Sequence, residues 1–247
     1  DGKLLVNNGV SVANVGTNAL TGASVGTKQG FSITKHAVSG ASVPYTVGHG
    51  LQKAPTFIIW KSLSSSNWVV YHVSTGNQSR TYLNLTNAAS SGEAYLNNTS
   101  PSSTVITMGS SGEFTGDMMI YSWHNVPGLQ KFGQYEGNTT EGAFVELGFR
   151  PAILWIKAID QTWYWNVHDN QRGPINPIQG NFLRLDSNAQ ENAGSGNNNI
   201  DFLSNGFKIR STTAQSEPTN VNGQTYIYCA WAEAPTVNLF GAQSNAR

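Results

Sequence analysis

The sequence is poor in charge. Lys and Arg number 14, Asp and Glu also number 14, and charged residues make up 11% of the 247 residues, against roughly 25% in typical soluble proteins. A formal net charge of zero provides no field that attracts phosphate backbones or anionic lipids. We therefore expect no nucleic acid among its partners, and a surface that is polar but mostly uncharged.

Cysteine and long apolar runs are equally scarce. Cys229 is the only cysteine, so no disulfide can form within the chain. Its apolar and aromatic neighbours favour a buried strand position over a reactive thiol. No run approaches the roughly 18 apolar residues that a membrane-spanning helix requires, so we expect no membrane insertion.

An internal repeat is the main positive feature of the sequence. The block Ala54–Lys61 has a counterpart in Arg150–Lys157, each with a Pro at its second position and a Lys at its last. The block Met119–Pro127 aligns with Ile227–Pro235, with Trp and Pro in register. Blocks that recur in one order indicate a tandem duplication.

Two further pairs of blocks extend the alignment. Asn67–His72 is aligned with Thr162–Asn166, which pairs Trp68 with Trp163. The blocks Tyr82–Leu85 and Phe182–Leu185 are aligned next, and both lead into loops rich in Asn, Ser and Ala.

Short runs of β-branched and aromatic residues, bounded by turn formers, predict strands through most of the chain. The pair Asn205-Gly206 lies between two such runs, Ile200–Leu203 and Phe207–Arg210, and predicts a hairpin. No window holds an apolar period typical of a helix. The sequence therefore predicts an all-β protein of two tandem antiparallel β-sandwich units, similar to jelly rolls.

The predicted boundaries follow from the repeat. Residues 1–30 carry scattered valines among polar residues and no large aromatic residue, which favours an extended N-terminal arm or linker. Residues 31–130 and 131–236 are the two predicted sandwiches. Residues 237–247 form a polar tail, and docking on a neighbouring subunit and plain disorder are both open for these ends.

The seven tryptophans are the first candidates for a binding site, because aromatic faces stack on sugars. Recurrence between the two units favours core packing for most of them. Trp163-Tyr164-Trp165 is different, since three consecutive aromatic residues in a strand must occupy both faces. A loop rich in hydrogen-bonding groups follows, so the predicted site for a glycan or partner consists of Trp163, Trp165, His168, Asp169, Asn170 and Arg172. The alternative is a hairpin whose outer aromatic residues pack on a neighbouring subunit.

The sequence offers no catalytic residues. A glycoside hydrolase needs two carboxylates roughly 5 to 10 Å apart, but the acidic residues are spread over separate predicted loops. The five histidines lack the short spacings of zinc sites, and no acidic loop resembles a calcium hand. We expect a protein that is not an enzyme, with no metal site and no cofactor.

Several blocks together resemble a repeat family in structural proteins of tailed phages, especially marine and cyanobacterial ones. They are Val47–Leu51 with Ala54–Ile59, Asn67–His72, Ile200–Lys208 and Tyr226–Pro235, and the likeness covers roughly residues 30 to 235. The first unit departs from the pattern, since Trp123–Pro127 replaces the small and acidic ending seen at Ala230–Pro235.

The resemblance implies a virion protein on the exterior of the particle, either a tail fibre or a head appendage or decoration. Its expected roles are particle assembly and attachment to the host surface. Its expected partners are other virion proteins and itself, as a homo-oligomer for which the family analogy implies a trimer, and also a host-surface glycan. The alternative function is a carbohydrate-binding module that uses an exposed aromatic platform.

Overall fold

The structure is a computed structural model, and it describes residues 5–6, 15–38, 43–64, 66–91, 95–140, 142–178, 181–191, 199–211 and 219–235. Strands account for 45% of the described residues and helices for 2%. The prediction of an all-β fold is therefore confirmed. Within the described ranges, none of the helical turns is long and apolar enough to cross a bilayer.

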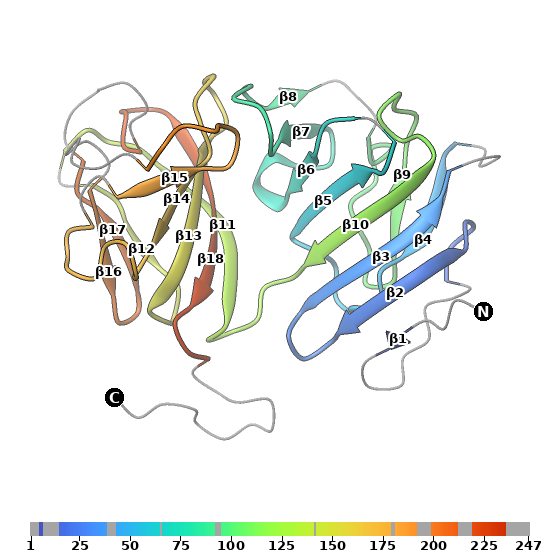
Figure 1. The fold of residues 1–247 in the computed structure, drawn as a ribbon, viewed down its shortest axis with the longest axis horizontal. Coiled ribbons are helices and arrows are strands. Elements are labelled where there is room, and N and C mark those ends of the chain that lie inside the picture. Colours follow the sequence, from blue (N-terminus) through green and yellow to red (C-terminus); the bar gives the residue numbers. More distant parts are fainter. Residues whose placement is uncertain are drawn as a thin grey trace. The chain divides into compact units, whose positions relative to one another are not determined.

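The chain divides into two compact units (Figure 1). Unit 1 comprises Asp1–Leu83 and Ala89–Asn125, and unit 2 comprises Asn84–Ala88 and Val126–Arg247. The boundary predicted after residue 130 falls inside a strand, β11 (Gln130–Glu136), of unit 2. Only a short segment separates this strand from the last strand of unit 1, so the sequence carries no visible linker there.

Unit 1 contains a large sheet with the strand order β1-β2-β3-β10-β5-β6-β7-β8 and a small sheet of β4 and β9. The strands are β1 Leu5–Val6, β2 Leu20–Gly26, β3 Phe31–Ala37, β4 Tyr45–Gly48, β5 Phe57–Ser62, β6 Val69–His72, β7 Ser79–Tyr82, β8 Ser90–Ser91, β9 Val105–Met108 and β10 Asp117–Trp123. One 3-10 turn, Val73–Thr75, follows β6.

Unit 2 contains a large sheet with the order β11-β18-β13-β14-β15 and a small sheet with the order β12-β17-β16. Its remaining strands are β12 Phe144–Glu146, β13 Pro151–Ala158, β14 Asn166–Asp169, β15 Phe182–Arg184, β16 Ile200–Leu203, β17 Gly206–Ile209 and β18 Thr225–Ala232. The predicted hairpin is confirmed, because β16 and β17 pair antiparallel, but its turn residues are Ser204 and Asn205, and Gly206 already pairs with Leu203.

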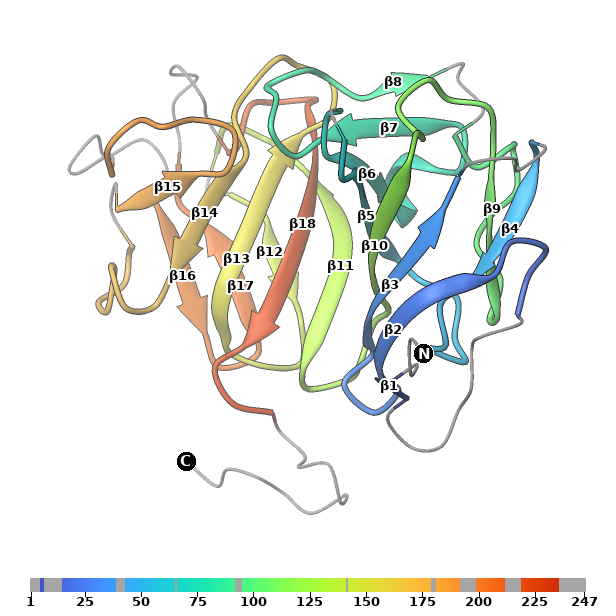
Figure 2. The ribbon, with the colours of Figure 1, turned by 45° about the vertical axis from the view of Figure 1, so that its right-hand side comes forward.

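The two units share one topology. The order β3-β10-β5-β6-β7 in unit 1 matches β11-β18-β13-β14-β15 in unit 2, and β4-β9 matches β12-β17. In both large sheets the last strand along the chain lies between two earlier strands: β10 lies between β3 and β5, and Figure 2 shows β18 between β11 and β13. This agreement is the one expected from the tandem duplication that the sequence predicts.

Each unit is a sandwich whose core lies between its large and small sheets. In unit 1, Trp60 and Ile120 of the large sheet share one buried cluster with Val47 and Ile106 of the small sheet. In unit 2, Leu154 and Tyr228 share a cluster with Phe207 and Ile209. Strict alternation of buried and partly buried residues along β3 and β10 reflects the two-residue period of a strand. Cys229 is also buried, and burial raises the pKa of its thiol well above the ordinary value.

The strand register corrects the sequence alignment of the repeats. The N–H of Leu83 donates to the carbonyl of Trp68 (2.9 Å), and the N–H of Leu185 donates to the carbonyl of Trp165 (3.2 Å). Trp68 therefore corresponds to Trp165, and the pairing of Trp68 with Trp163 was wrong. The same bonds make Leu83 equivalent to Leu185, which shifts the Tyr82–Leu85 alignment by two residues.

The arm predicted over residues 1–30 was also wrong in part. Leu20–Gly26 forms β2, which pairs antiparallel with β3, and Figure 2 shows the two strands side by side. Leu20 and Val25 are buried in the unit 1 core. Residues 1–4, 7–14 and the predicted tail 237–247 lie outside the described residues.

The two units differ at one pair of facing residues, where unit 2 has a smaller residue on one strand and a larger one on the strand opposite. Thr34 lies opposite Ile120 in unit 1, and the equivalent pair in unit 2 is Gly133 opposite Tyr228. A Cβ atom on Gly133 would lie 2.6 Å from the Tyr228 hydroxyl oxygen and 2.9 Å from the ring carbon Cζ. The absent side chain of Gly133 thus makes room for the tyrosine ring.

Gly133→Ala is expected to lower the free energy of unfolding by about 1 to 3 kcal/mol, the usual cost of overpacking a filled site. Adding Tyr228→Ile, the unit 1 residue, to Gly133→Ala is expected to recover part of that loss. Urea unfolding followed by circular dichroism measures both effects. A Gly133→Ala variant as stable as the parent would contradict the steric argument.

Candidate functional site

The predicted binding residues lie just before β14, within it and in the turn that follows. Trp165 and His168 are both 0% exposed. A fully buried indole cannot present a face to a sugar, so the predicted aromatic platform was wrong for Trp165. The physical reason is that Trp163-Tyr164-Trp165 is not a strand: β14 begins at Asn166, and the alternation argument does not apply to these residues.

Trp163 is only half-buried, but its ring packs against the unit 2 core. It stacks on Tyr226 with the ring centroids 6.4 Å apart and an interplanar angle of 18°. Its carbonyl accepts a hydrogen bond of 2.7 Å from the Lys157 ammonium. Trp163 therefore belongs to the margin of the core rather than to an exposed platform.

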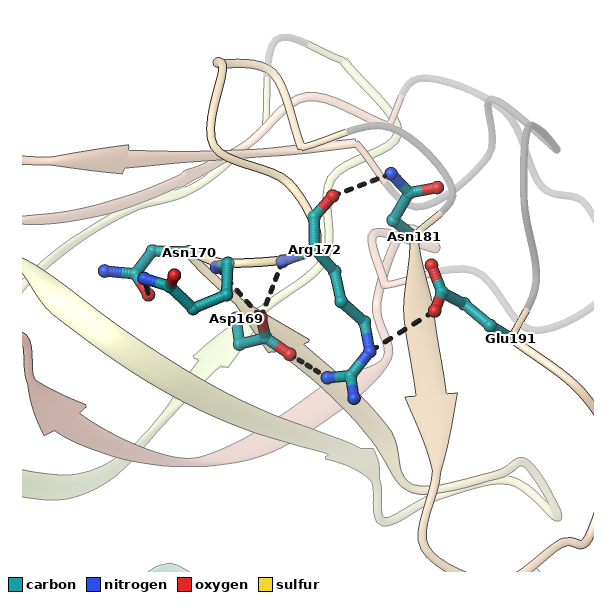
Figure 3. A network of polar contacts seen from close by, with 6 residues as sticks. Asp169, Asn170, Arg172, Asn181 and Glu191 are labelled. Atoms are coloured by element: carbon teal, nitrogen blue, oxygen red, sulfur yellow. Dashed lines mark hydrogen bonds and ion pairs between the residues drawn. The ribbon is translucent and has the colours of Figure 1, made fainter.

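The polar residues of the prediction do come together, in the turn after β14 (Figure 3). Asp169 Oδ1 accepts hydrogen bonds from the N–H groups of Gln171 (2.9 Å) and Arg172 (2.8 Å). The Arg172 guanidinium forms ion pairs with Asp169 and, through Nε at 3.3 Å, with Glu191. Partial burial raises the pKa of Asp169, but these N–H groups and the guanidinium outweigh it and the net shift is downward. Asn170 is half-buried beside this network.

An open depression of about 430 Å³ lies at the same turn, lined by residues 172–177 and Asn181. Ile175 is 78% exposed there, between Pro174 and Pro177. The site thus has a polar side at Arg172, where the two carboxylates balance the positive charge, and an exposed apolar side chain at Ile175.

The loop that carries the depression is braced at three points. The Asn176 side chain donates to the Phe202 carbonyl and accepts from the Phe202 N–H, both at 2.9 Å, which ties the loop to β16. The Asn181 amide donates to the Arg172 carbonyl at 2.9 Å. Gly173 packs so closely on Ile178 that a Cβ atom would lie 2.3 Å from Ile178 Cγ2. Because the loop is already restrained, it loses less conformational entropy when a partner binds.

The described residues at this site offer polar and apolar contacts to a binding partner. Among the described residues that line the depression, Arg172 is the one cation and is held between two carboxylates, and none is a serine, cysteine or histidine. Across the described part of the chain, no cluster of three or more His, Cys, Asp or Glu is placed to hold a metal ion. Burial lowers the pKa of His36, His49 and His168 to about 4, which keeps these imidazoles neutral near pH 7.

The apolar half of the site was not predicted from the sequence. Ile175 and Asn176 carry no motif, and the available signal was an isolated isoleucine between two prolines in a polar stretch. Prolines restrict the backbone and favour a loop held in one conformation. The aromatic residues were the stronger candidates, because they are the usual contacts of sugars.

Fold and site together define an all-β double-sandwich protein with a braced surface loop as its candidate binding site. The chain belongs to the family described as Domain of unknown function (DUF7483), whose model matches residues 6–235. That match takes in strands of both units, from β1 to β18. The chain matches none of the curated proteins and none of the solved structures with which it was compared.

Proposed function

We propose that the chain is a non-enzymatic structural protein of a phage particle, carried on its exterior as a tail fibre or head decoration subunit. Support comes from the resemblance of its repeat blocks to tailed-phage structural proteins and from its uncharged, Asn- and Ser-rich composition. The duplicated sandwich suits a scaffold that presents loops. The proposed roles are particle assembly and host-surface attachment.

The observation that carries the proposal is the braced loop around Ile175. A large apolar side chain exposed on a restrained loop loses little freedom on binding, and it can enter a pocket of a partner. Arg172 and Asn181 border it with polar groups, as in the polar rim of a protein interface. We assign the partner as a protein, because the indole that would have stacked on a sugar is buried at Trp165.

A site of this kind binds firmly only when many copies of the protein are present on one particle. One small contact is weak, but many copies on one particle raise the effective concentration of the second and later contacts. The proposed homo-oligomer serves the same end by presenting several loops at once.

Ile175→Asp is expected to weaken binding to the coat proteins of the encoding phage at least tenfold, because an unpaired carboxylate would enter the apolar contact. The measurement is light scattering of the purified protein, alone and mixed with those coat proteins. The parent protein is expected to form a heavier species on mixing, and the variant is not.

Leu63→Asp is the matched control, since Leu63 is an apolar residue of unit 1 that is 54% exposed. It is expected to leave coat binding unchanged. Equal losses in the two variants would indicate a general effect of added charge. A parent protein that binds no coat protein would refute the proposal, and glycan binding lost on Trp163→Ala in folded protein would favour the carbohydrate-binding module.

A further inference from the structure

A row of polar side chains is buried in the large sheet of unit 1. Ser32, Thr34 and His36 alternate along β3, and Ser122 of the neighbouring strand β10 lies directly opposite Ser32 (Figure 2). These four residues form the polar row of unit 1, and all four are 0% exposed. Polar side chains are seldom buried completely unless their polar atoms are paired. The polar row therefore requires an explanation.

The side chains of the polar row point into the core. Thr34 lies opposite Ile120, and His36 lies opposite Met118. Facing residues of an antiparallel pair share one side of the sheet, and Ile120 and Met118 both belong to the buried cluster between the large and small sheets of unit 1. Residues two apart on a strand also share one side. The whole polar row thus lies between the two sheets, out of contact with bulk solvent.

The polar atoms of the row are nearly all unpaired. The hydroxyls of Ser32, Thr34 and Ser122 have no hydrogen-bond partner among the described residues. His36 Nε2 lies 3.2 Å from the Tyr45 hydroxyl oxygen, but His36 Nδ1 has no partner there either. Each such group gives up the hydrogen bonds that it makes with water in the unfolded chain, which is costly when nothing replaces them. The polar row needs a partner that the described residues do not supply.

Unit 2 shows that the fold itself does not require these polar groups. The strand register makes Gly133 the equivalent of Thr34 and Ala230 the equivalent of Ser122. Neither Gly133 nor Ala230 has a polar side-chain atom, so nothing is left unpaired at these two positions.

The other two equivalents in unit 2 are polar, but both are paired. The Lys131 ammonium donates to the Glu146 carbonyl at 2.7 Å. The Tyr135 hydroxyl donates to the Thr219 carbonyl, also at 2.7 Å. At these four positions, unit 2 either removes or satisfies each side-chain polar group, whereas unit 1 keeps a row of unpaired ones. The difference indicates a ligand that is specific to unit 1.

The groups in the row select a small neutral ligand. The hydroxyls are uncharged, and burial lowers the pKa of His36 to about 4 against the opposing effect of Asp117, so its ring is neutral near pH 7. A neutral lining does not offset the cost of removing an ion from water. A hydroxyl both donates and accepts hydrogen bonds, which suits a ligand that does the same. Side chains two apart on a strand are separated by roughly 7 Å, a gap that bridging water molecules can span.

We propose that Ser32, Thr34, His36 and Ser122 bind a row of ordered water molecules inside unit 1. The waters bridge neighbouring members of the polar row and supply the hydrogen bonds that the protein lacks there. Buried waters characteristically bind polar groups that would otherwise be unpaired, and they are costly to remove. They therefore act as structural ligands of unit 1, and the equivalent positions of unit 2 hold none.

Thr34→Val tests the proposal, because it replaces the hydroxyl with a methyl group of nearly the same volume. The variant is expected to lose at least one slowly exchanging water, measured by magnetic relaxation dispersion of water in solutions of the full chain. Its urea midpoint is expected to fall. An unpaired hydroxyl would behave in the opposite way, since its replacement by an apolar group removes a desolvation cost and raises the midpoint.

Thr56→Val is the matched control in the same unit. The Thr56 hydroxyl donates to the Trp123 carbonyl at 3.4 Å and lies outside the polar row. This variant is expected to leave the number of bound waters unchanged. An unchanged water count in Thr34→Val, a raised urea midpoint in that variant, or an equal loss of water in both variants would overturn the proposal.

A crystal structure of the parent protein provides a test that needs no variant. Ordered waters are expected within hydrogen-bond distance of the Ser32, Thr34 and Ser122 hydroxyls. Direct hydrogen bonds among these side chains, or a larger molecule in place of water, would contradict the assignment.

Discussion

Acidification from pH 7 to pH 4 is expected to unfold the protein. Three fully buried histidines, His36, His49 and His168, have their pKa lowered to about 4 by burial. The ordinary histidine pKa is 6.5, so each unfolded histidine binds a proton more readily than its folded form. The stabilising effect of keeping them neutral is complete above pH 6.5 and is lost as the pH falls from 6.5 to about 4. Protonation of each histidine can lower the free energy of unfolding by about 3 kcal/mol.

The surroundings of the three rings explain why protonation is costly. At His49, Nδ1 accepts a hydrogen bond from the Leu51 N–H at 3.2 Å, and Nε2 lies 3.2 Å from the Ser102 carbonyl oxygen. A second ring proton would point at the Leu51 N–H. At His168, neither ring nitrogen has a hydrogen-bond partner among the described residues, and the ring lies 5.5 Å from Phe182 between centroids.

Nearby charges offset only part of the lowering of the histidine pKa values by burial. Asp117 raises the pKa of His36 and Asp169 raises that of His168, but desolvation outweighs both carboxylates. The His124 ring lowers the pKa of His49 further. Small domains are stable by roughly 5 to 15 kcal/mol, so the combined loss is large enough to unfold the chain.

The measurement is the urea midpoint at a series of pH values from 7.5 to 4, followed by circular dichroism and tryptophan fluorescence. His168→Tyr is the informative variant, because the strand register makes Tyr71 the unit 1 equivalent of His168. It is expected to move the acid transition of unit 2 to lower pH. A stability that does not change between pH 6.5 and 4 would contradict the assignment.

Lys157→Ala is expected to lower the free energy of unfolding by about 3 to 5 kcal/mol, from the cavity and the carbonyls left without a donor. Lys157 is 0% exposed. Its ammonium donates to the carbonyls of Trp163 (2.7 Å), Thr86 (3.0 Å) and Gln161 (3.3 Å). Burial lowers the pKa of Lys157 to about 8, against the opposing effect of Asp186, so the group stays mostly charged at pH 7.

The repeat supplies the control for this experiment. Lys61 occupies the equivalent position in unit 1 and donates to the carbonyls of Ser62 (2.8 Å) and Ser66 (3.0 Å), but it is only half-buried. Lys61→Ala is expected to cost about 1 kcal/mol. Urea unfolding of both variants measures the difference. Equal costs would mean that the depth of burial at Lys157 does not set its contribution.

Strand content was predictable from the sequence, because short β-branched runs and the hairpin signal at Asn205-Gly206 specify local geometry. The register was not. Trp163 and Trp165 lie two residues apart, so either can be aligned with Trp68, and the strand register together with the hydrogen bond from Leu185 to Trp165 decides between them. The strand β2 was missed because its pairing partner, rather than its own composition, places it in the sheet.

The candidate site was predictable only on its polar side. Asp169 followed by Arg172 is a local pattern, and the structure brings the two together. The burial of Trp165 depends on residues distant in the sequence. The exposure of Ile175 depends on the bond between Asn176 and Phe202, which joins residues 26 positions apart. Such long-range packing leaves no trace in a single sequence.

The position of the central strands has a consequence for synthesis on the ribosome. In each large sheet a central strand comes last along the chain. It is β10, between β3 and β5, in unit 1 and β18, between β11 and β13, in unit 2. Neither sheet can close until its final strand has left the exit tunnel, and the nascent chain must keep two separate strand groups from pairing wrongly until then. A chain that stops before Thr225 would leave β11 and β13 without the strand that unites them, so unit 2 can complete its large sheet only after β18 has been synthesised.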